Sequence, residues 1–565
     1  MEFNLADLFE GVVDSVTQID PDRLALVAGD VRLTYSELDA RANRLAHYLI
    51  DAGVGPGDHV GIYSWNRAEW IESMLGVYKI RAVPININYR YVVDELAYIF
   101  DNADLVALVF ERAFSPNVTA TDLPSSLSRL IVIDDGSPEA LPPGAVTYEE
   151  ALEAFAPDRR GLGPRSPDDL YILYTGGTTG MPKGVMWRSE DIFFAALGGG
   201  NAAFPIAQAQ DIAKNASGRG GTFVVTPPMM HGAAQWVALI ALFSAGTVAL
   251  YVGHTFDPEA VLDLAQSERA ISILVVGDAM ARPLAETIGA HPGRWDLSAL
   301  LVIGSGGAIL SEAIKNQLQN ELPGVRILDS FGASETGHNG SVHDIDVTTG
   351  RPRFRVGPHT AVLGDDLLPV TPGSGQIGRL ARRGNIPLAY YKDADKTAAT
   401  FLIDPDGQRW VIPGDHASVD GDGHVLVLGR GSECINTGGE KVFPEEVEAA
   451  LKSHPDVYDA VVVGIPDERF TERVAALVQA RPGGSPDLAG LSEHCRRRIA
   501  GFKAPRELVL VNDLHRSAAG KPDYRWARQV ALAALGLGPL ADDAKPSQAG
   551  KPSQAGKPPK LPRPD

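Results

Sequence analysis

The residues best suited to chemistry lie in one short run, Tyr174-Thr175-Gly176-Gly177-Thr178-Thr179-Gly180-Met181-Pro182-Lys183-Gly184. Glycine lets the main chain approach an anion closely and adopt positive φ, while hydroxyl groups and a lysine add donors and positive charge. The composition is therefore typical of a loop that binds phosphate. The apolar stretch 170–174 before it predicts a strand, so the loop follows a strand end. Its spacing matches neither the Walker motif nor the GxGxxG motif of dinucleotide folds.

The run resembles the phosphate-binding loop of the adenylate-forming superfamily, which contains acyl-CoA synthetases, carrier-linked adenylation domains and beetle luciferases. Further matches follow in the family's order: FGASETG at 331–337, PGD at 413–415, GRGSE at 429–433 and GK at 520–521. Five motifs in this order identify the chain as a member. It is most similar to actinobacterial steroid side-chain acyl-CoA synthetases, which share the TGGTTG loop and the runs at 184–188, 277–283 and 517–527.

This resemblance implies a two-step reaction. A carboxylate is a poor electrophile, so it attacks the α-phosphate of ATP to give an acyl-adenylate and pyrophosphate, and the mixed anhydride then reacts with a thiol. The first step needs a carboxylate held near the α-phosphate, neutralised charge on phosphorus, and a metal on the phosphates. ATP and CoA are therefore expected as co-substrates, Mg²⁺ as the metal, and a carboxylic acid as the substrate.

The resemblance also implies which residues hold the nucleotide and the metal. Glu335 would bind Mg²⁺ together with Thr175, because this ion prefers a few hard oxygen ligands. Asp415 would accept hydrogen bonds from the ribose hydroxyls. Phe331 would stack on one face of adenine, and Asp329 or Ser330 would meet its edge. The remaining residues expected around ATP are Gly176, Gly177, Thr178, Thr179, Lys183, Gly306, Gly307, Ala308, Gly332, Ser334 and Arg430.

The lysine of the C-terminal Gly-Lys pair, Lys521, is expected to bridge the carboxylate and the phosphate during adenylation. A mobile ammonium on a flexible stem suits a role that ends before CoA enters. In the family the small C-terminal domain then rotates about a hinge, which the motif places at Ser432. Gly439 and Lys441 would border the CoA tunnel in the rotated state.

The acyl site is expected at His231, which follows Pro227-Pro228-Met229-Met230 and occupies the position of the family's aromatic or histidine gate. Small residues follow it, Gly232, Ala233 and Ala234, and we expect them to leave volume for a bulky or long acyl group. The chain departs from the family at three positions. Gly176 stands where most members have Ser, and Pro413 stands where Thr or Ser is usual. Ser432 stands where Asp or Lys is usual. None of these departures removes a group that the mechanism requires.

The composition excludes several classes of protein. The net charge of −20 should repel nucleic acid and anionic membranes. Two cysteines, Cys434 and Cys495, exclude a disulfide framework and suit a reducing cytoplasm. The acidic N-terminus lacks the features of a signal peptide. No Lys, Arg, Asp or Glu occurs between Arg219 and Asp257. Within this stretch, we interpret the apolar run from Trp236 to Gly253 as a buried helix, a turn and a buried strand rather than a membrane span.

Apolar runs alternate with helical patterns from about residue 57, which predicts parallel sheets covered by helices on both faces and a site at the strands' carboxyl ends. Loops after Tyr174 and Ile303 and a turn after Leu328 are expected there. Short segments rich in Gly, Pro and Asp after about residue 357 suggest an antiparallel barrel-like subdomain. We expect a large domain at 1–430, an α+β lid at 431–535, and a disordered tail at 536–565 that repeats KPSQAG.

The sequence therefore favours an ATP-dependent acyl-CoA synthetase acting on a steroid side-chain acid or a long-chain fatty acid. A medium-chain fatty acid ligase and an adenylation enzyme that loads a carrier protein are the alternatives, although no carrier domain follows Lys521. A non-catalytic relative would be expected to lose Lys521 or Glu335. A luciferase-like oxygenase would need a luciferin pocket that the sequence does not show. The oligomeric state is open, and a homodimer is compatible with the chain.

Overall fold

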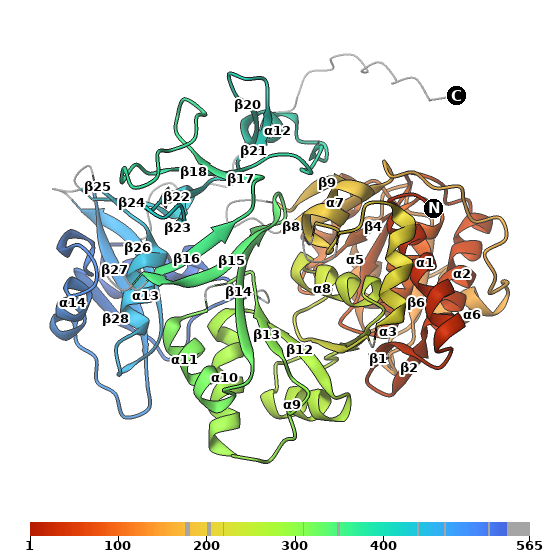
Figure 1. Ribbon diagram of the computed structural model, residues 1–565, viewed down its shortest axis with the longest axis horizontal. Helices are drawn as coiled ribbons and strands as arrows, with labels where there is room; N and C mark the ends of the chain where they lie inside the picture. The colour runs from red at the N-terminus through yellow and green to blue at the C-terminus, as the bar shows by residue number, and fades with distance from the viewer. Residues whose placement is uncertain are drawn as a thin grey trace.

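Two helix-covered sheets make up the larger part of the computed structural model, which describes residues 1–175, 181–200, 205–218, 220–308, 310–346, 351–437, 440–467, 471–517 and 520–538 (Figure 1). The first sheet is entirely parallel in the order β4-β3-β5-β6-β7. Its strands are β3 (His59–Tyr63), β4 (Val83–Asn86), β5 (Leu105–Glu111), β6 (Arg129–Ile133) and β7 (Val146–Thr147). The alternation in the sequence predicts this arrangement.

The second sheet is parallel along β1-β11-β10-β12-β13-β14, with β2 antiparallel at its edge. Its strands are β1 (Leu24–Ala28), β2 (Val31–Thr34), β10 (Thr222–Val225), β11 (Thr247–Leu250), β12 (Ala270–Val275), β13 (Val302–Ser305) and β14 (Arg326–Ala333). The associated helices are α1 (Leu5–Ile19), α2 (Tyr35–Asp51), α3 (Ala68–Lys79), α4 (Val93–Asn102), α5 (Ser115–Ala120), α6 (Tyr148–Glu153), α7 (Ser189–Ala196), α8 (Gly232–Phe243), α9 (Pro258–Ser267), α10 (Gly277–Ala290) and α11 (Glu312–Glu321).

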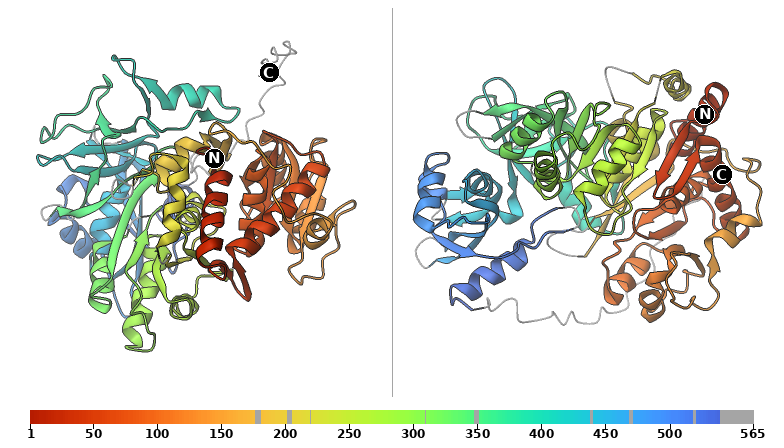
Figure 2. Two further views of the ribbon diagram at one scale, coloured as in Figure 1. Left: turned by 45° about the vertical axis from the view of Figure 1, so that its right-hand side comes forward. Right: turned by 90° about the horizontal axis from the view of Figure 1, so that it is seen from below.

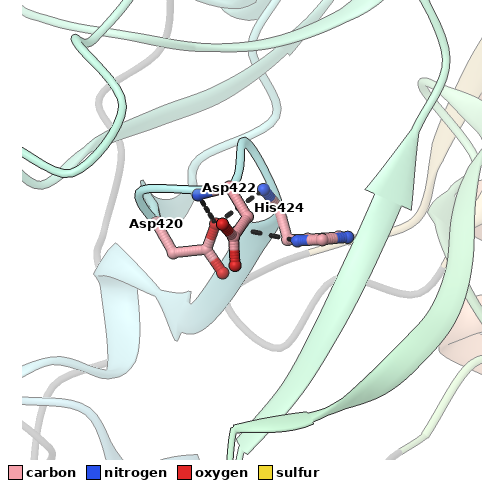
Figure 3. Close-up of side chains that lie close together, drawn as sticks. All are labelled: Asp420, Asp422 and His424. Atoms are coloured by element: carbon pink, nitrogen blue, oxygen red, sulfur yellow. Dashed lines mark hydrogen bonds and ion pairs between the residues drawn. The ribbon is translucent and has the colours of Figure 1, made fainter.

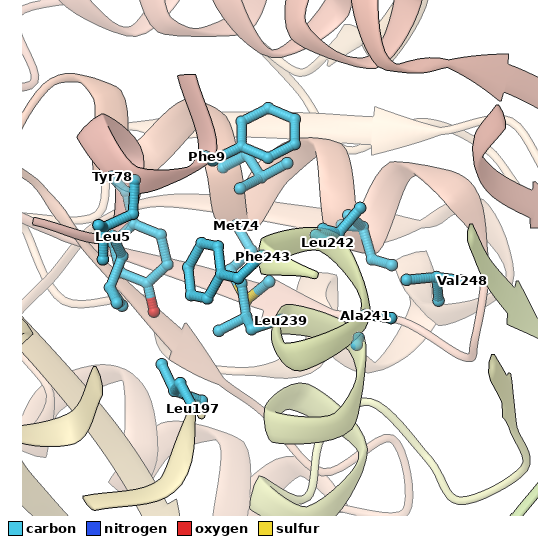
Figure 4. Close-up of a cluster of buried hydrophobic side chains, with 14 of the residues drawn as sticks. Leu5, Phe9, Met74, Tyr78, Leu197, Leu239, Ala241, Leu242, Phe243 and Val248 are labelled. Carbon is cyan, nitrogen blue, oxygen red and sulfur yellow. The ribbon is translucent and has the colours of Figure 1, made fainter. Parts of the chain in front are cut away.

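The main core lies where α1, α3 and α8 meet (Figure 4). Each helix contributes apolar side chains four residues apart, which place them on one helical face. These pairs are Leu5 and Phe9, Met74 and Tyr78, and Leu239 and Phe243. The apolar run 236–253 contains most of α8, a turn and β11, so the prediction of a buried helix, turn and strand is confirmed. Among the described residues, every helix is too short or too polar to cross a bilayer.

Strand β14 differs from the prediction, because no turn follows Leu328. The strand continues to Ala333 and changes partner on the way. It pairs in parallel with β13 up to Asp329 and antiparallel with β15 (Gly337–Asp346) from Ser330 onward. A Cβ on Gly332 would lie 2.2 Å from the Gly337 carbonyl oxygen, so glycine permits the close approach of the two strands. The strand thus carries the predicted adenine-site residues directly toward Glu335.

The segments rich in Gly, Pro and Asp form antiparallel strands, as predicted, and they extend the same sheet through β15. They are β16 (Arg351–Val356), β17 (Thr360–Leu363), β18 (Gly378–Arg382), β20 (Phe401–Ile403), β21 (Arg409–Val411), β22 (Asp415–Val419) and β23 (Val425–Arg430), with α12 (Ala394–Thr400) before β20. One strand of this region, β19 (Ala389–Tyr390), pairs elsewhere. It joins β9 (Lys183–Arg188) and β8 (Leu170–Thr175) in a separate three-stranded sheet.

The C-terminal part has a five-stranded sheet of its own, drawn in blue in Figures 1 and 2. Its strands are β24 (Ile435–Thr437), β25 (Glu440–Val442), β26 (Val457–Asp467), β27 (Thr471–Ala480) and β28 (Glu507–Leu510), and its helices are α13 (Pro444–Lys452), α14 (Leu488–Arg496) and α15 (Tyr524–Ala534). Two hydrophobic clusters within residues 435–535 contain only residues of this part. The predicted tail lies outside the described residues from 539 onward.

Candidate active site

The base of the glycine-rich loop is a strand pair. Strands β8 and β9 are antiparallel, and Thr175 lies opposite Lys183 in their register. Asn86 at the end of β4 holds the end of β8 before the loop, because its side-chain amide bonds both the N–H and the C=O of Tyr174 at 2.8 Å. The loop residues Gly176, Gly177, Thr178 and Thr179 lie outside the described residues. The structure shows the two paired strands, β8 and β9, that hold the ends of this loop.

Ser334 and Glu335 lie at the tip of the tight β14–β15 hairpin. The N–H of Ala333 donates to the Thr336 hydroxyl at 3.0 Å, which closes the turn. Gly337 has φ +65°, and a Cβ there would lie 2.8 Å from the carbonyl oxygen of Ala195 on α7. The indole N–H of Trp187 on β9 donates to the Ser334 carbonyl at 3.0 Å. These contacts hold the hairpin tip against the strand that follows the loop.

Strand β19 connects the two halves of the predicted phosphate and metal site. The Tyr390 hydroxyl donates to Oε1 of Glu335 at 2.8 Å. Three residues later, the Asp393 carboxylate lies 2.5 Å from the Lys183 ammonium. The oxygen donors of Glu335 and Thr175 fit the preference of Mg²⁺ for hard ligands. Neither Tyr390 nor Asp393 lies in one of the sequence motifs, so the sequence alone predicts no role for them.

The residues expected at adenine lie at the ends of β13 and along β14. Gly307, with φ +90°, lies in the turn after β13 between Gly306 and Ala308. The hydroxyl groups of Ser330 and Ser341 are 3.1 Å apart. The ring of Phe331 lies 4.3 Å from that of Phe354 on β16, and Gly332 follows where the hairpin closes.

Asp329 is involved in an ion pair that the sequence did not predict. Its carboxylate lies 2.6 Å from the ammonium of Lys315 on α11. The side chain is buried, and this burial raises the pKa of Asp329, an effect that Lys315 opposes. Asp329 is therefore engaged with α11, whereas the neighbouring Ser330 is engaged with β15.

The predicted ribose residue Asp415 begins β22 and lies opposite Arg430 in the β22–β23 register. Gly414 before it has φ +108°, and its carbonyl accepts from the Gly431 N–H at 3.1 Å. Ser432 lies in a short 3₁₀ turn, Gly431–Glu433, which links this hairpin to the C-terminal part. Gly439 and the side chains of Arg430, Ser432 and Lys441 lie outside the described residues.

His231 immediately precedes α8 and is held by two buried asparagines. The amide of Asn66 donates to the Pro227 carbonyl at 3.0 Å and accepts from the Met229 N–H at 2.7 Å. Asn86 also donates to the Met230 carbonyl at 2.7 Å. One side chain, Asn86, therefore ties the phosphate-loop strand to the segment that carries His231.

The imidazole of His231 is neutral at pH 7. Burial is the largest cause that lowers its pKa to about 4, and the positive charges of Lys521 and Arg90 contribute to the same shift. Its Nε2 is buried and has no hydrogen-bond partner within the described chain. The charge effect also shows that Lys521, almost three hundred residues away in the sequence, lies in the neighbourhood of His231.

The small residues after His231 differ in their surroundings. A Cβ on Gly232 would lie 2.7 Å from Leu173 and 3.3 Å from Trp236, so these side chains fill the space beside the glycine. Ala233 is partly exposed, whereas Ala234 is fully buried in the core. Of the three, Ala233 is the position that remains open to a ligand.

Lys521 is placed by a tight loop that docks on the larger domain. The Gly520 N–H donates to the Ser517 carbonyl at 2.8 Å, and the Ser517 N–H donates to the Lys521 carbonyl at 2.8 Å. Gly520 has φ +68°, and a Cβ there would lie 3.1 Å from Val276 and 3.6 Å from Ala279 at the start of α10. The loop that carries Lys521 therefore lies close to the start of α10.

The side chains of Asp420, Asp422 and His424 lie close together in the turn between β22 and β23 (Figure 3). The Asp420 carboxylate accepts the backbone N–H groups of Asp422 and His424, both at 2.9 Å. The guanidinium of Arg353 lies 2.7 Å from each of the two carboxylates. An arginine therefore supplies the positive charge at this cluster.

Comparisons with known proteins show the family to which this chain is similar. Residues 14–391 match the family model of AMP-binding enzymes, and residues 446–521 match that of the AMP-binding enzyme C-terminal domain. A medium/long-chain-fatty-acid–CoA/3-oxocholest-4-en-26-oate–CoA ligase of Mycolicibacterium smegmatis is 48% identical over 94% of this chain and 97% of its own length. A 3-oxocholest-4-en-26-oate–CoA ligase of Rhodococcus rhodochrous is also 48% identical, over 94% of this chain and 96% of its own.

Solved structures show the same fold at lower sequence identity. An anthranilate CoA ligase in complex with anthranoyl-AMP superposes with a TM-score of 0.77 at 23% identity, covering 93% of this chain and 98% of the other. ATP-bound MatB from Rhodopseudomonas palustris gives 0.75 at 24% identity, covering 92% and 98%. The mixed α/β architecture with a small C-terminal part is therefore common to this chain and these neighbours.

Proposed function

The chain belongs to the AMP-binding enzymes, and from this premise we propose that it is an ATP-dependent acyl-CoA ligase. It would join a carboxylic acid to CoA through an acyl-adenylate, with release of AMP and pyrophosphate. The observation that carries the proposal is the placement of Lys521 near His231 by a loop docked on α10. The influence of the Lys521 charge on His231 supports the assignment of Lys521 to adenylation and of His231 to the acyl site.

In this proposal each group acts on a charge that develops during adenylation. Lys521 holds the carboxylate and the α-phosphate together, which reduces the repulsion between two anions. Lys183 and the loop bind the β- and γ-phosphates, while Glu335 and Thr175 hold the metal. When bound, Mg²⁺ neutralises phosphate charge. The neutral imidazole of His231 adds no positive charge that would compete for the carboxylate.

The second step requires CoA to reach the adenylate, so Lys521 has to leave. We propose that residues 431–535 rotate about Ser432 as a lid, with 1–430 as the larger domain. The contacts that would break on rotation are modest. They include the Gly520 loop on α10, an Arg481–Glu286 ion pair at 3.8 Å, and Arg282 over the Tyr458 ring at 4.9 Å. Gly439 and Lys441 would then border the CoA tunnel.

The proposed substrates are steroid side-chain acids and medium- to long-chain fatty acids, as in lipid and sterol degradation, and the names of the 48% identical relatives support this range. The proposal includes the cytoplasm as the compartment, because a chain with only two cysteines suits a reducing environment. A homodimer remains a prediction from the sequence.

The proposal can be tested with purified full-length protein, Mg²⁺, ATP and CoA. Candidate acids are 3-oxocholest-4-en-26-oate, palmitate, octanoate and benzoate, and the products AMP and acyl-CoA are quantified by mass spectrometry. We expect both products with the steroid acid and with at least one aliphatic acid. AMP formation without acyl-CoA would favour a carrier protein as the acceptor. Activity with fatty acids alone would contradict the steroid assignment.

A further inference from the structure

The segment 389–393 links three regions of the molecule that are far apart in the sequence. Through β19 it pairs with β9, where Tyr390 lies opposite Val185 and the Tyr391 N–H donates to the Gly184 carbonyl at 2.7 Å. Its side chains then reach both sides of the predicted triphosphate site. The segment thus forms a wall of that site without belonging to any motif found in the sequence.

Asp393 is fixed in place by more than its contact with Lys183. One carboxylate oxygen, Oδ1, accepts the Lys396 N–H at 2.9 Å and so caps α12, while Oδ2 lies 2.5 Å from the Lys183 ammonium. Lys392 before it has φ +53°, a backbone bend that turns Asp393 toward β9. The carboxylate is therefore held at the strand end where the phosphate loop rejoins the sheet.

The remainder of the segment is anchored on the opposite side. The Tyr391 hydroxyl and the Lys392 ammonium both bind the Asp104 carboxylate at 2.7 Å. Tyr390 is buried and donates to Glu335. If Lys183 moves toward a ligand, Asp393 consequently stays in place. The contacts of the residues before Asp393 and its cap of α12 fix its position.

The Lys183–Asp393 pair is accessible to an incoming anion. The Lys183 side chain is 39% exposed and that of Asp393 is 27% exposed. The hydrogen bond from Lys183 lowers the pKa of the Asp393 carboxyl, which is therefore ionised at neutral pH. A triphosphate carries several negative charges, so it attracts the same ammonium and is repelled by the same carboxylate.

We propose that Asp393 is a positioning residue that competes with phosphate for Lys183. It holds the ammonium at the strand end while the site has no nucleotide, yields it to the β- and γ-phosphates of ATP, and takes it back as pyrophosphate leaves. Asp393 thereby lowers the affinity of the site for pyrophosphate and limits inhibition by this product. The inference rests on the proposed function, because it assigns phosphate to Lys183.

The test compares the binding of Mg²⁺–pyrophosphate, Mg²⁺–ATP and AMP to the full chain by isothermal titration calorimetry. The variant Asp393→Asn removes the charge but keeps an oxygen that can cap α12. An exposed ion pair contributes little, so we expect pyrophosphate and ATP to bind about two- to fivefold more tightly to this variant. AMP has no β- or γ-phosphate, and its affinity should not change.

Two controls separate this effect from a change in structure. Asp104→Asn breaks a comparable ion pair on the same segment and should leave all three affinities unchanged. In a Lys183→Ala chain, Asp393→Asn should lose its effect on pyrophosphate, which a double-mutant cycle measures. Unchanged or weaker pyrophosphate binding by Asp393→Asn, or an equal gain in Asp104→Asn, would overturn the inference. A wild-type protein that binds neither ATP nor pyrophosphate would overturn the proposed function as well.

Discussion

The neutral state of His231 is a property that can be measured directly. A pKa of about 4, against an ordinary value near 6.5, means that protonating this imidazole in the folded protein costs about 3 kcal/mol more than protonating an ordinary exposed histidine. Between pH 4 and 6.5 the unfolded chain binds a proton at this position that the folded chain does not bind. This contribution therefore makes the protein more stable as pH rises through that window and less stable as pH falls toward 4. His231→Gln should lose that part of the pH dependence.

The assay is an NMR titration of protein with ¹³C-labelled histidine, in which the signal missing from His231→Gln identifies His231. We expect this signal to titrate near pH 4 in the wild type. In Lys521→Ala its pKa should rise, because one of the two cations that disfavour the imidazolium is gone. A wild-type pKa of 6 or above would refute the burial argument. An unchanged pKa in Lys521→Ala would show that Lys521 does not face this site.

Three further predictions concern activity. Lys521→Ala should abolish formation of the acyl-adenylate but spare CoA transfer from a supplied adenylate, and equal loss in both half-reactions would contradict its proposed role. Tyr390→Phe removes a hydrogen bond to the Glu335 carboxylate, so it should raise the Mg²⁺ concentration needed for half-maximal pyrophosphate release about tenfold. Glu335→Gln should raise the same concentration by more than Tyr390→Phe does. Unaltered Mg²⁺ dependence in both variants would exclude Glu335 from the metal site. Ala233→Trp should depress turnover of the steroid acid more than that of octanoate, and equal loss of both would argue against a wide pocket at this position.

The regular elements could be predicted because their signals are local. The apolar stretch 170–174 lies within β8, and the uncharged stretch after Arg219 contains β10, α8 and β11. The continuation of β14 could not be predicted, since residues 329–333 are too polar and glycine-rich to give a strand signal. Their conformation is set by β15, which supplies the partner strand.

The expected site residues could be identified because their motifs are short and contiguous. The residues that position them could not, since Asn66, Asn86, Tyr390 and Asp393 act through contacts with distant segments. Asn86 bonds Tyr174 across 88 residues, and Asp393 reaches Lys183 across 210. An isolated asparagine or aspartate in a sequence has no pattern that reveals such a partner. Even Asp329, which the motif suggested for adenine, is paired with Lys315 on α11.

The three-stranded sheet β19-β9-β8 has a consequence for biosynthesis. Strands β8 and β9 are neighbours in the chain, but β19 is translated some two hundred residues after them. Contacts of such long range form late, because the loop-closure entropy must be overcome before they contribute stability. A nascent chain that ends before residue 390 can form the β8–β9 hairpin but lacks the partners of Lys183 and Glu335. The contacts of Lys183 with Asp393 and of Glu335 with Tyr390 can thus form only after synthesis has passed residue 393.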